Sequence, residues 1–188
     1  MRIISGLHKG KKINEPKDIK TRPLKDLTKE SIFNIINHSN KFKIDIKKSK
    51  ILDLFSGVGS FGIECLSRGA KNVVFIENYQ KVLPVLKRNL DNLKNIENYE
   101  ILEKDIYDLN TFENLDDKFE IIFLDPPYKD KNSKLLLNRI ISNDLLNKKG
   151  IIIIHRHKNE KEIFPNSLKI IEEKNYGISK ILFLTYLN

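Results

Sequence analysis

The sequence is poor in cysteine and tryptophan and has no long apolar run. Cys65 is the one cysteine among 188 residues, so no disulfide can form within the chain, which suits a reducing compartment. One cysteine and scattered histidines do not give the ligand spacing of a structural zinc site, and we expect no metal. No apolar run approaches the ~20 residues that cross a bilayer, and the N-terminus lacks the apolar stretch of a signal peptide. We therefore expect a cytoplasmic protein that does not bind membranes.

The excess positive charge is confined to the N-terminal part of the chain. Residues 1–50 hold 14 Lys and Arg residues against 5 Asp and Glu residues, which leaves +9 there. Residues 51–188 hold 20 of each sign, so their net charge is zero. Clustered positive charge is typical of a protein that binds a polyanion, and a solvated basic face is the alternative.

Short apolar runs alternate with helical patterns from Lys50 onward, which is typical of an α/β fold with a mainly parallel sheet. Strands are predicted at residues 50–55, 72–77, 99–105, 119–125 and 150–157, and helices near residues 61–69, 81–93 and 133–146. Residues 168–187 predict an antiparallel hairpin that turns at Tyr176 and Gly177. We therefore predict a Rossmann-like fold with a seven-stranded sheet, and not the six parallel strands of a dehydrogenase domain.

Glycine and proline mark three boundaries of these elements. Gly69 is a natural C-terminal stop for the helix that precedes it. Gly150 predicts a turn ahead of the fifth strand. Pro84 fits a helix only in the first turn, so the helix within residues 81–93 begins late.

The N-terminal segment predicts two small elements outside the core of the fold. "RIISGLHKGKKI" (2–13) is a basic, hairpin-like piece with Gly6 and Gly10 near its turn. Residues 22–39 have helical spacing, and the side chains expected to face inward are Leu24, Leu27, Phe33 and Ile36. We expect a single domain, made of a basic extension over residues 1–45 and a ligand-binding core over residues 46–188.

A glycine pattern lies between the first strand and the helix that follows it. "DLFSGVGSFG" (53–62) contains a complete G-x-G-x-x-G, which permits a tight turn and close approach of a ligand to the backbone. Glu77 follows 20 residues after Gly57, at the end of the next strand, where an acid binds ribose hydroxyls. Asp105 ends the third strand, where it or the following backbone can meet an adenine edge. Solvated acids are the alternative, but three such groups at one sheet edge predict a nucleoside ligand.

Asp53 indicates which nucleoside binds. In redox folds the glycine turn cradles a pyrophosphate, and a carboxylate four residues ahead of that turn would repel it. A carboxylate favours a ligand with an ammonium or sulfonium group. S-adenosylmethionine (SAM) has both groups and no phosphate, so SAM is the predicted cofactor.

The segment "FLDPPY" (123–128) predicts a second site at the same edge of the sheet. The two prolines stiffen the loop and remove donors, so the Asp125 carboxylate and the Pro126 carbonyl can both accept hydrogen bonds from one amine. Such acceptors localise the nitrogen lone pair of a nucleobase amine and stabilise the positive charge that develops as a methyl group arrives. Tyr128 supplies a flat face on which a base that has left its helix can stack. A rigid turn after a strand is the alternative.

Several segments together resemble the bacterial 16S ribosomal RNA guanine-(N-2) methyltransferase family over nearly the whole chain. They are "MRIISGLHKGKKI", "TRP" followed by "KESIFNII", "LDLFSGVGSFGIECLSRGA", "VVFIE" and "FLDPPY". Two departures bear on the placement of the acceptor. Leu24 stands where the family usually has threonine, and His155-Arg156-His157 stand where it usually has an acid at the end of the fifth strand.

The resemblance implies a set of site residues. Those implied to hold SAM are Asp53, Gly57, Gly59, Glu77 and Asp105, and we expect Phe55, Ser56, Asn78 and Ile106 beside them to complete the cofactor contacts. The implied acceptor site is Asp125, Pro126, Pro127 and Tyr128, with Arg22 and Phe33 beside it. RNA contacts are expected from Lys9, Lys11, Lys12 and Arg22.

The predicted function is SAM-dependent methylation of a guanine 2-amino group in 16S ribosomal RNA, by a monomer that binds ribosomal RNA or the small ribosomal subunit. Two alternatives remain: an adenine 6-amino methyltransferase for DNA or RNA, because "DPPY" suits either amine, and a silent RNA-binding or assembly protein. His155 and His157 share one face of a strand, and we interpret them as surface or RNA-contacting residues because nothing completes a metal site.

Overall fold

The computed structural model describes residues 1–16, 24–113, 115 and 117–187. The helices are α1 (Asp26–His38), α2 (Ser60–Ser67), α3 (Leu83–Asp91) and α4 (Ser133–Ser142), with short 3-10 turns at Ile46–Lys48 and Leu109–Thr111. The strands are β1 (Lys50–Leu54), β2 (Asn72–Ile76), β3 (Tyr99–Leu102), β4 (Phe119–Leu124), β5 (Leu146–His157), β6 (Leu168–Tyr176) and β7 (Ser179–Tyr186). No helix within these described residues is long and apolar enough to cross a membrane.

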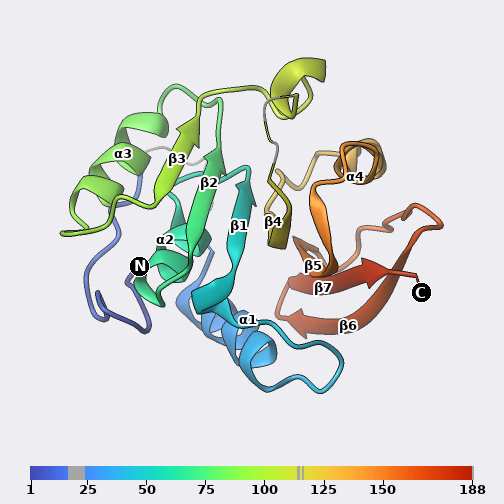
Figure 1. Ribbon diagram of the computed structural model, residues 1–188, viewed down its shortest axis with the longest axis horizontal. Coiled ribbons are helices and arrows are strands. Elements are labelled where there is room, and N and C mark those ends of the chain that lie inside the picture. The colour runs from blue at the N-terminus through green and yellow to red at the C-terminus, as the bar shows by residue number, and fades with distance from the viewer. Residues whose placement is uncertain (17–23, 114, 116, 188) are drawn as a thin grey trace.

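The strands form one seven-stranded sheet in the order β3-β2-β1-β4-β5-β7-β6 (Figure 1). β1 to β5 run parallel to one another, while β7 runs antiparallel to both β5 and β6. The mainly parallel sheet and the closing hairpin are confirmed. Parallel sheets bind ligands at the carboxyl ends of their strands, and the strand order reverses between β1 and β4, so this edge is where a site is expected.

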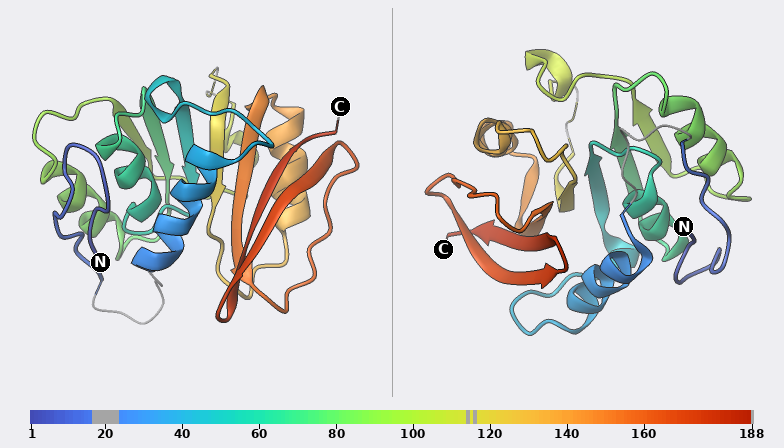
Figure 2. Two further views of the ribbon diagram at one scale, coloured as in Figure 1. Left: turned by 90° about the horizontal axis from the view of Figure 1, so that it is seen from below. Right: turned by 180° about the vertical axis from the view of Figure 1, so that it is seen from behind.

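Two helical layers cover the sheet, α1 to α3 on one face and α4 on the other (Figure 2). Alternate residues of the central strands supply the two cores. Ile51, Phe75 and Phe123 pack toward α1 to α3, whereas Leu52, Val74 and Ile122 pack toward α4. Strands that are buried on both faces are nearly continuously apolar, so these strands could be predicted from the apolar runs in the sequence.

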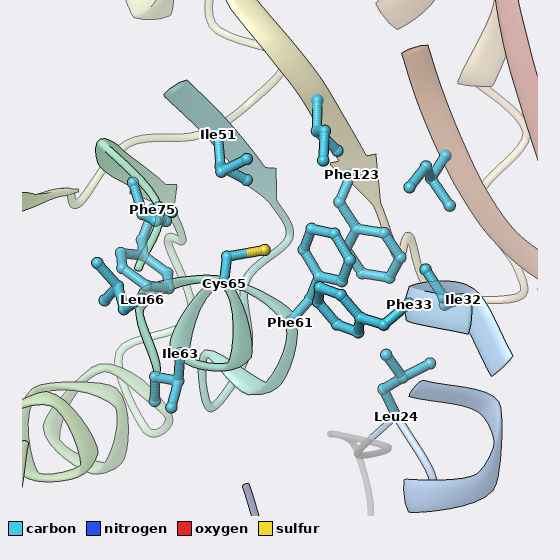
Figure 3. Close-up of a cluster of buried hydrophobic side chains, with 14 of the residues drawn as sticks. Leu24, Ile32, Phe33, Ile51, Phe61, Ile63, Cys65, Leu66, Phe75 and Phe123 are labelled. Carbon is cyan, nitrogen blue, oxygen red and sulfur yellow. The ribbon is translucent and has the colours of Figure 1, made fainter. Parts of the chain in front are cut away.

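Three phenylalanine rings connect α1, α2 and β4 beneath the ligand-binding edge (Figure 3). The centroids of the Phe33 and Phe61 rings lie 5.3 Å apart, and those of Phe61 and Phe123 lie 4.1 Å apart. All three side chains are buried. Stacked aromatic rings contribute about 0.5–1.5 kcal/mol per pair beyond the area that they bury. This stack holds the middle of α1 against the core.

The helix and strand boundaries confirm some predictions and correct others. Gly69 has a φ of +87° just after α2, and Pro84 lies in the first turn of α3, as predicted. The prediction of a turn at Gly150 was wrong, because β5 begins at Leu146, where a predicted helix was to end. The prediction that Leu27 faces inward was also wrong, because its side chain is 80% exposed.

The basic N-terminal segment is docked on the helical layer through buried charges. Its hairpin-like character is confirmed by an antiparallel bridge between Arg2 and Lys12. Glu64 of α2 is fully buried and accepts hydrogen bonds from the backbone N–H groups of Ile4 (2.7 Å) and Ser5 (2.9 Å). Lys29 of α1, also fully buried, lies 3.8 Å from Glu64.

Asn89 of α3 joins the basic N-terminal segment to residues 55–59, which connect β1 to α2 and are called the glycine loop below. Its side chain accepts a hydrogen bond from the backbone N–H of Asn14 at 2.8 Å and donates one to the carbonyl of Val58 at 3.0 Å. Asn89 is 3% exposed, so both bonds are shielded from water. The N-terminal segment therefore contributes to the placement of the glycine loop.

Candidate active site

A cavity of about 950 Å³ lies at the carboxyl ends of β1 to β5. The glycine loop after β1 and the residues that follow β2 and β3 line one side. Asp125 to Tyr128 and His155 line the other. Leu24, Lys25 and Thr28 near the start of α1, with residues 176–179 at the turn between β6 and β7, complete the wall. The two halves of the site predicted from the sequence therefore share one space.

The glycine loop turns sharply, and its backbone is held by a carboxylate. Phe55 and Gly57 both have a φ of +56°, a left-handed conformation that costs a non-glycine residue about 1 kcal/mol or more. Glu77 accepts a hydrogen bond from the Gly57 N–H at 2.7 Å through one carboxylate oxygen. Its other oxygen accepts from the N–H groups of Asn78 (2.9 Å) and Tyr79 (2.8 Å). The predicted residues that line the cavity here are Phe55, Ser56, Gly57, Glu77 and Asn78, whereas the predicted Gly59 does not line it.

Gly62 and Asp53 form the support behind the loop. A Cβ atom at Gly62 would lie 2.3 Å from the Phe75 ring, so only glycine fits there. The Gly62 N–H donates to the Asp53 carboxylate at 2.9 Å. Asp53 is 1% exposed and is not among the cavity-lining residues, and its burial raises the pKa of its carboxyl well above the ordinary value. The structure thus places Asp53 under the loop, and its contact with the cofactor stays a prediction.

The end of β3 joins the two halves of the site. Asp105 and Ile106 line the cavity, and the Asp105 carboxylate accepts from the N–H of Tyr107 at 2.8 Å. The Tyr107 hydroxyl donates at 2.7 Å to Asp130, which lies two residues after the predicted acceptor segment, residues 125–128. Burial and this bond raise the pKa of Tyr107, which therefore stays protonated and keeps donating. Tyr107 was not predicted as a site residue.

The acceptor loop, residues 125–128, directly follows β4. Asp125, Pro126, Pro127 and Tyr128 all line the cavity, and their role as an acceptor site stays a prediction. The Tyr128 hydroxyl is hydrogen-bonded to that of Ser179 at 2.9 Å, which ties the loop to the closing hairpin. The Tyr128 ring therefore forms a fixed flat wall beside Asp125.

Comparisons with known proteins assign this chain to a family. The family model described as "Conserved hypothetical protein 95" matches residues 1–185. The chain is 32% identical to ribosomal RNA small subunit methyltransferase D of Haemophilus influenzae over 95% of this chain and 90% of that one. It is 31% identical to the protein of the same name from Buchnera aphidicola subsp. Baizongia pistaciae, over 100% of this chain and 92% of that one. The chain belongs to this family of methyltransferases.

Solved structures agree with this assignment. The Escherichia coli protein yhhF is 26% identical and superposes with a TM-score of 0.81 over 99% of this chain and 97% of that one. The Streptococcus mutans protein SMU.776, which shares the fold at a TM-score of 0.65 and 13% identity over 84% of this chain and 49% of that one, is complexed with SAH. The predicted Rossmann-like methyltransferase fold is confirmed. The glycine loop, Glu77 and Asp105 fit SAM, because they offer backbone contacts and acceptors to a ligand without phosphates.

A buried arginine holds the acceptor loop of this methyltransferase from behind, and the sequence interpretation missed it. Arg156 of β5 is 1% exposed and pairs with Glu162. Its guanidinium also donates to the backbone carbonyls of Pro127, at 3.1 Å, and Asp130. Three acceptors on one planar donor fix the path of the loop. An arginine two positions after the buried apolar run at residues 151–154 of the same strand was the available signal.

The two histidines at the end of β5 have defined contacts in the site. The side chain of His155 is only 12% exposed and contacts Asp125, so its interpretation as a surface residue was wrong, while RNA contact by either histidine stays a prediction. His157 packs edge-on against Tyr128, with ring centroids 5.2 Å apart. The described residues contain no group of three or more His, Cys, Asp or Glu side chains that could hold a metal ion.

The predicted RNA-contacting lysines differ in their surroundings. Lys9 and Lys12 are exposed, whereas the ammonium of Lys11 donates to the backbone carbonyl of Asn92 at 2.9 Å. Arg22 lies outside the described residues. Lys25 and Lys104 line the cavity and were not predicted.

Proposed function

We propose that this protein transfers a methyl group from SAM to the 2-amino group of a guanine in 16S ribosomal RNA. The observation that carries the proposal is the single cavity shared by the glycine loop and by Asp125 to Tyr128. A volume of about 950 Å³ accommodates a nucleoside cofactor and an extruded base together. The relatives named as small-subunit ribosomal RNA methyltransferases support the choice of substrate.

The acceptor loop prepares the amine for reaction. The Asp125 carboxylate and the Pro126 carbonyl each accept a hydrogen bond from the amine. These two bonds draw the nitrogen lone pair out of conjugation with the ring. SAM supplies an electrophilic methyl group when bound. As the nitrogen–carbon bond forms at the expense of the methyl–sulfur bond of SAM, which would leave S-adenosylhomocysteine, the same two oxygens stabilise the positive charge on nitrogen. The surplus proton leaves the nitrogen last and passes to water. Tyr128 holds the base by stacking, since its ring is fixed through Ser179.

The basic N-terminal extension is proposed to dock the RNA. Exposed Lys9 and Lys12 would contact phosphates, which fix the position of the RNA without reading its sequence. Lys25, which is exposed and lines the cavity, is proposed to contact the phosphates next to the extruded nucleotide. We propose a monomer that acts in the cytoplasm on ribosomal RNA or the small subunit.

The proposal is tested by following methyl transfer from labelled SAM to RNA of small subunits from cells that lack this gene. The RNA is digested to nucleosides, and the labelled nucleoside is identified. We expect label in N2-methylguanosine. Label in N6-methyladenosine would establish the adenine alternative, and SAM binding without transfer to naked RNA or to subunits would establish the silent protein.

Glu77→Ala is expected to weaken the binding of SAM and of S-adenosylhomocysteine. The carboxylate is both the predicted acceptor for the ribose hydroxyls and the partner of the Gly57 N–H. Leaving such groups unpaired costs about 1–3 kcal/mol, which is roughly a 5- to 150-fold weaker affinity. Isothermal titration calorimetry measures the affinity for both ligands, with Glu97→Ala on an exposed loop as the control variant. Equal dissociation constants for Glu77→Ala and wild type would remove Glu77 from the cofactor site.

A further inference from the structure

The end of β5 brings a histidine against the acceptor carboxylate. β4 and β5 are parallel, and Leu124 is paired with Ile154, so Asp125 and His155 follow side by side at the same sheet edge. The Nδ1 atom of His155 lies 2.8 Å from Oδ1 of Asp125. Both side chains line the cavity and are mostly buried, with 12% of His155 and 20% of Asp125 exposed.

The direction of this hydrogen bond follows from the chemistry of the two groups. An ionised carboxylate only accepts, so the imidazole must carry its proton on Nδ1 and donate it. Bonds to a carboxylate are stronger than those between neutral groups and restrict the side chain that accepts them. One oxygen of Asp125 is then committed to His155, which leaves Oδ2 for a ligand.

The surroundings of His155 fix the imidazole itself. The Tyr128 ring stands edge-on to it, with centroids 6.5 Å apart. In β7, Ile181 is paired with His155 across the antiparallel ladder and is buried. The guanidinium of the neighbouring Arg156 pairs with Glu162 and donates to the carbonyls of Pro127 and Asp130. These donors are therefore used by groups other than the Asp125 carboxylate. His155 therefore has a defined place from which to orient the carboxylate.

We propose that His155 is a positioning residue for methyl transfer. Its Nδ1–H holds the Asp125 carboxylate so that Oδ2 faces the amine of the acceptor base. This inference rests on the proposed function, and it assigns to His155 a role in the rate and not in binding. A misplaced reacting or polarising group costs about 10- to 100-fold in rate, and that is the scale expected here.

Three substitutions separate positioning from packing. His155→Leu removes the donor, His155→Asn places an amide N–H close to the position of Nδ1, and His155→Gln places one near Nε2. We expect the leucine and glutamine variants to lower kcat about 10- to 100-fold, with KM for RNA and the affinity for S-adenosylhomocysteine within twofold. The asparagine variant should regain most of kcat. His38→Leu, an exposed histidine at the end of α1, is the matched control.

A spectroscopic measurement tests the contact without RNA. In protein labelled with ¹⁵N-histidine, His155 should show the Nδ1–H tautomer, and Asp125→Ala should shift that signal while leaving the His38 signal in place. A wild-type Nε2–H tautomer would overturn the proposal. So would wild-type kcat in His155→Leu, or equal losses in the leucine and asparagine variants. If the wild type methylates no RNA, the proposed function fails, and the spectra decide only whether His155 donates to Asp125.

Discussion

Asp125→Ala should lower the rate of methyl transfer by about 10³-fold or more while S-adenosylhomocysteine still binds with nearly wild-type affinity. In the proposed mechanism the carboxylate is one of two acceptors for the amine, and its removal leaves the developing charge on nitrogen without its main stabilising group. The proposed cofactor contacts come from the other side of the cavity, from the glycine loop, Glu77 and Asp105. The loss should therefore fall on kcat, since it removes an interaction made mainly in the transition state.

Asp125→Asn is the informative companion variant. It keeps one acceptor oxygen, so measurable activity should remain. Single-turnover methylation and calorimetry with S-adenosylhomocysteine give the two quantities, and Asp91→Ala at the exposed end of α3 is the control. If the Asp125→Ala variant turns over near the wild-type rate, the acceptor site lies elsewhere in the cavity.

Arg156→Met should destabilise the fold by about 3–5 kcal/mol and also abolish most of the activity. The guanidinium is 1% exposed and holds the Glu162 carboxylate with the carbonyls of Pro127 and Asp130. Methionine fills much of the same volume but leaves a buried carboxylate and two carbonyls without their donor. The acceptor loop then loses the contact that fixes its path, so Asp125 and Tyr128 are displaced together.

A double variant separates the two effects of Arg156. Adding Glu162→Leu to Arg156→Met removes the unpaired carboxylate, so part of the free energy of unfolding should return. Methyl transfer should stay low, because the loop carbonyls still lack a donor. Urea unfolding measures the first quantity and labelled methyl transfer the second. A single variant within 1 kcal/mol of wild type would show that Arg156 does not support the loop.

The central strands and the cofactor half of the site could be predicted because they depend on local patterns. "KILDL" and "FEIIFL" are apolar on both faces, as strands covered on two sides must be. The glycine loop and Glu77 are separated by one helix and one strand, so their spacing alone brings them together. The loop at Asp125 was found for the same reason, since it directly follows a buried strand.

The features that the sequence interpretation missed depend on pairing between distant segments. Gly150 follows two lysines and looked like a turn, but Leu146 already pairs with Phe119, and the ladder continues after a register shift. Leu27 lies outside the buried face of α1, which is set by Thr28, Lys29, Ile32, Phe33 and Ile36. His155 could have been placed against Asp125, because both directly follow paired residues of neighbouring parallel strands. The aligned ends of β4 and β5 were the unused signal.

The cavity draws its walls from parts of the chain that are made at very different times during synthesis. The glycine loop, β1, β2 and β3 lie within residues 50–102 and can assemble from contacts of short sequence separation. The acceptor side needs the turn between β6 and β7, and the contact of Ser31 with Tyr176 spans 145 positions. A domain generally folds as a unit. The cavity therefore cannot be complete until the final hairpin has been synthesised.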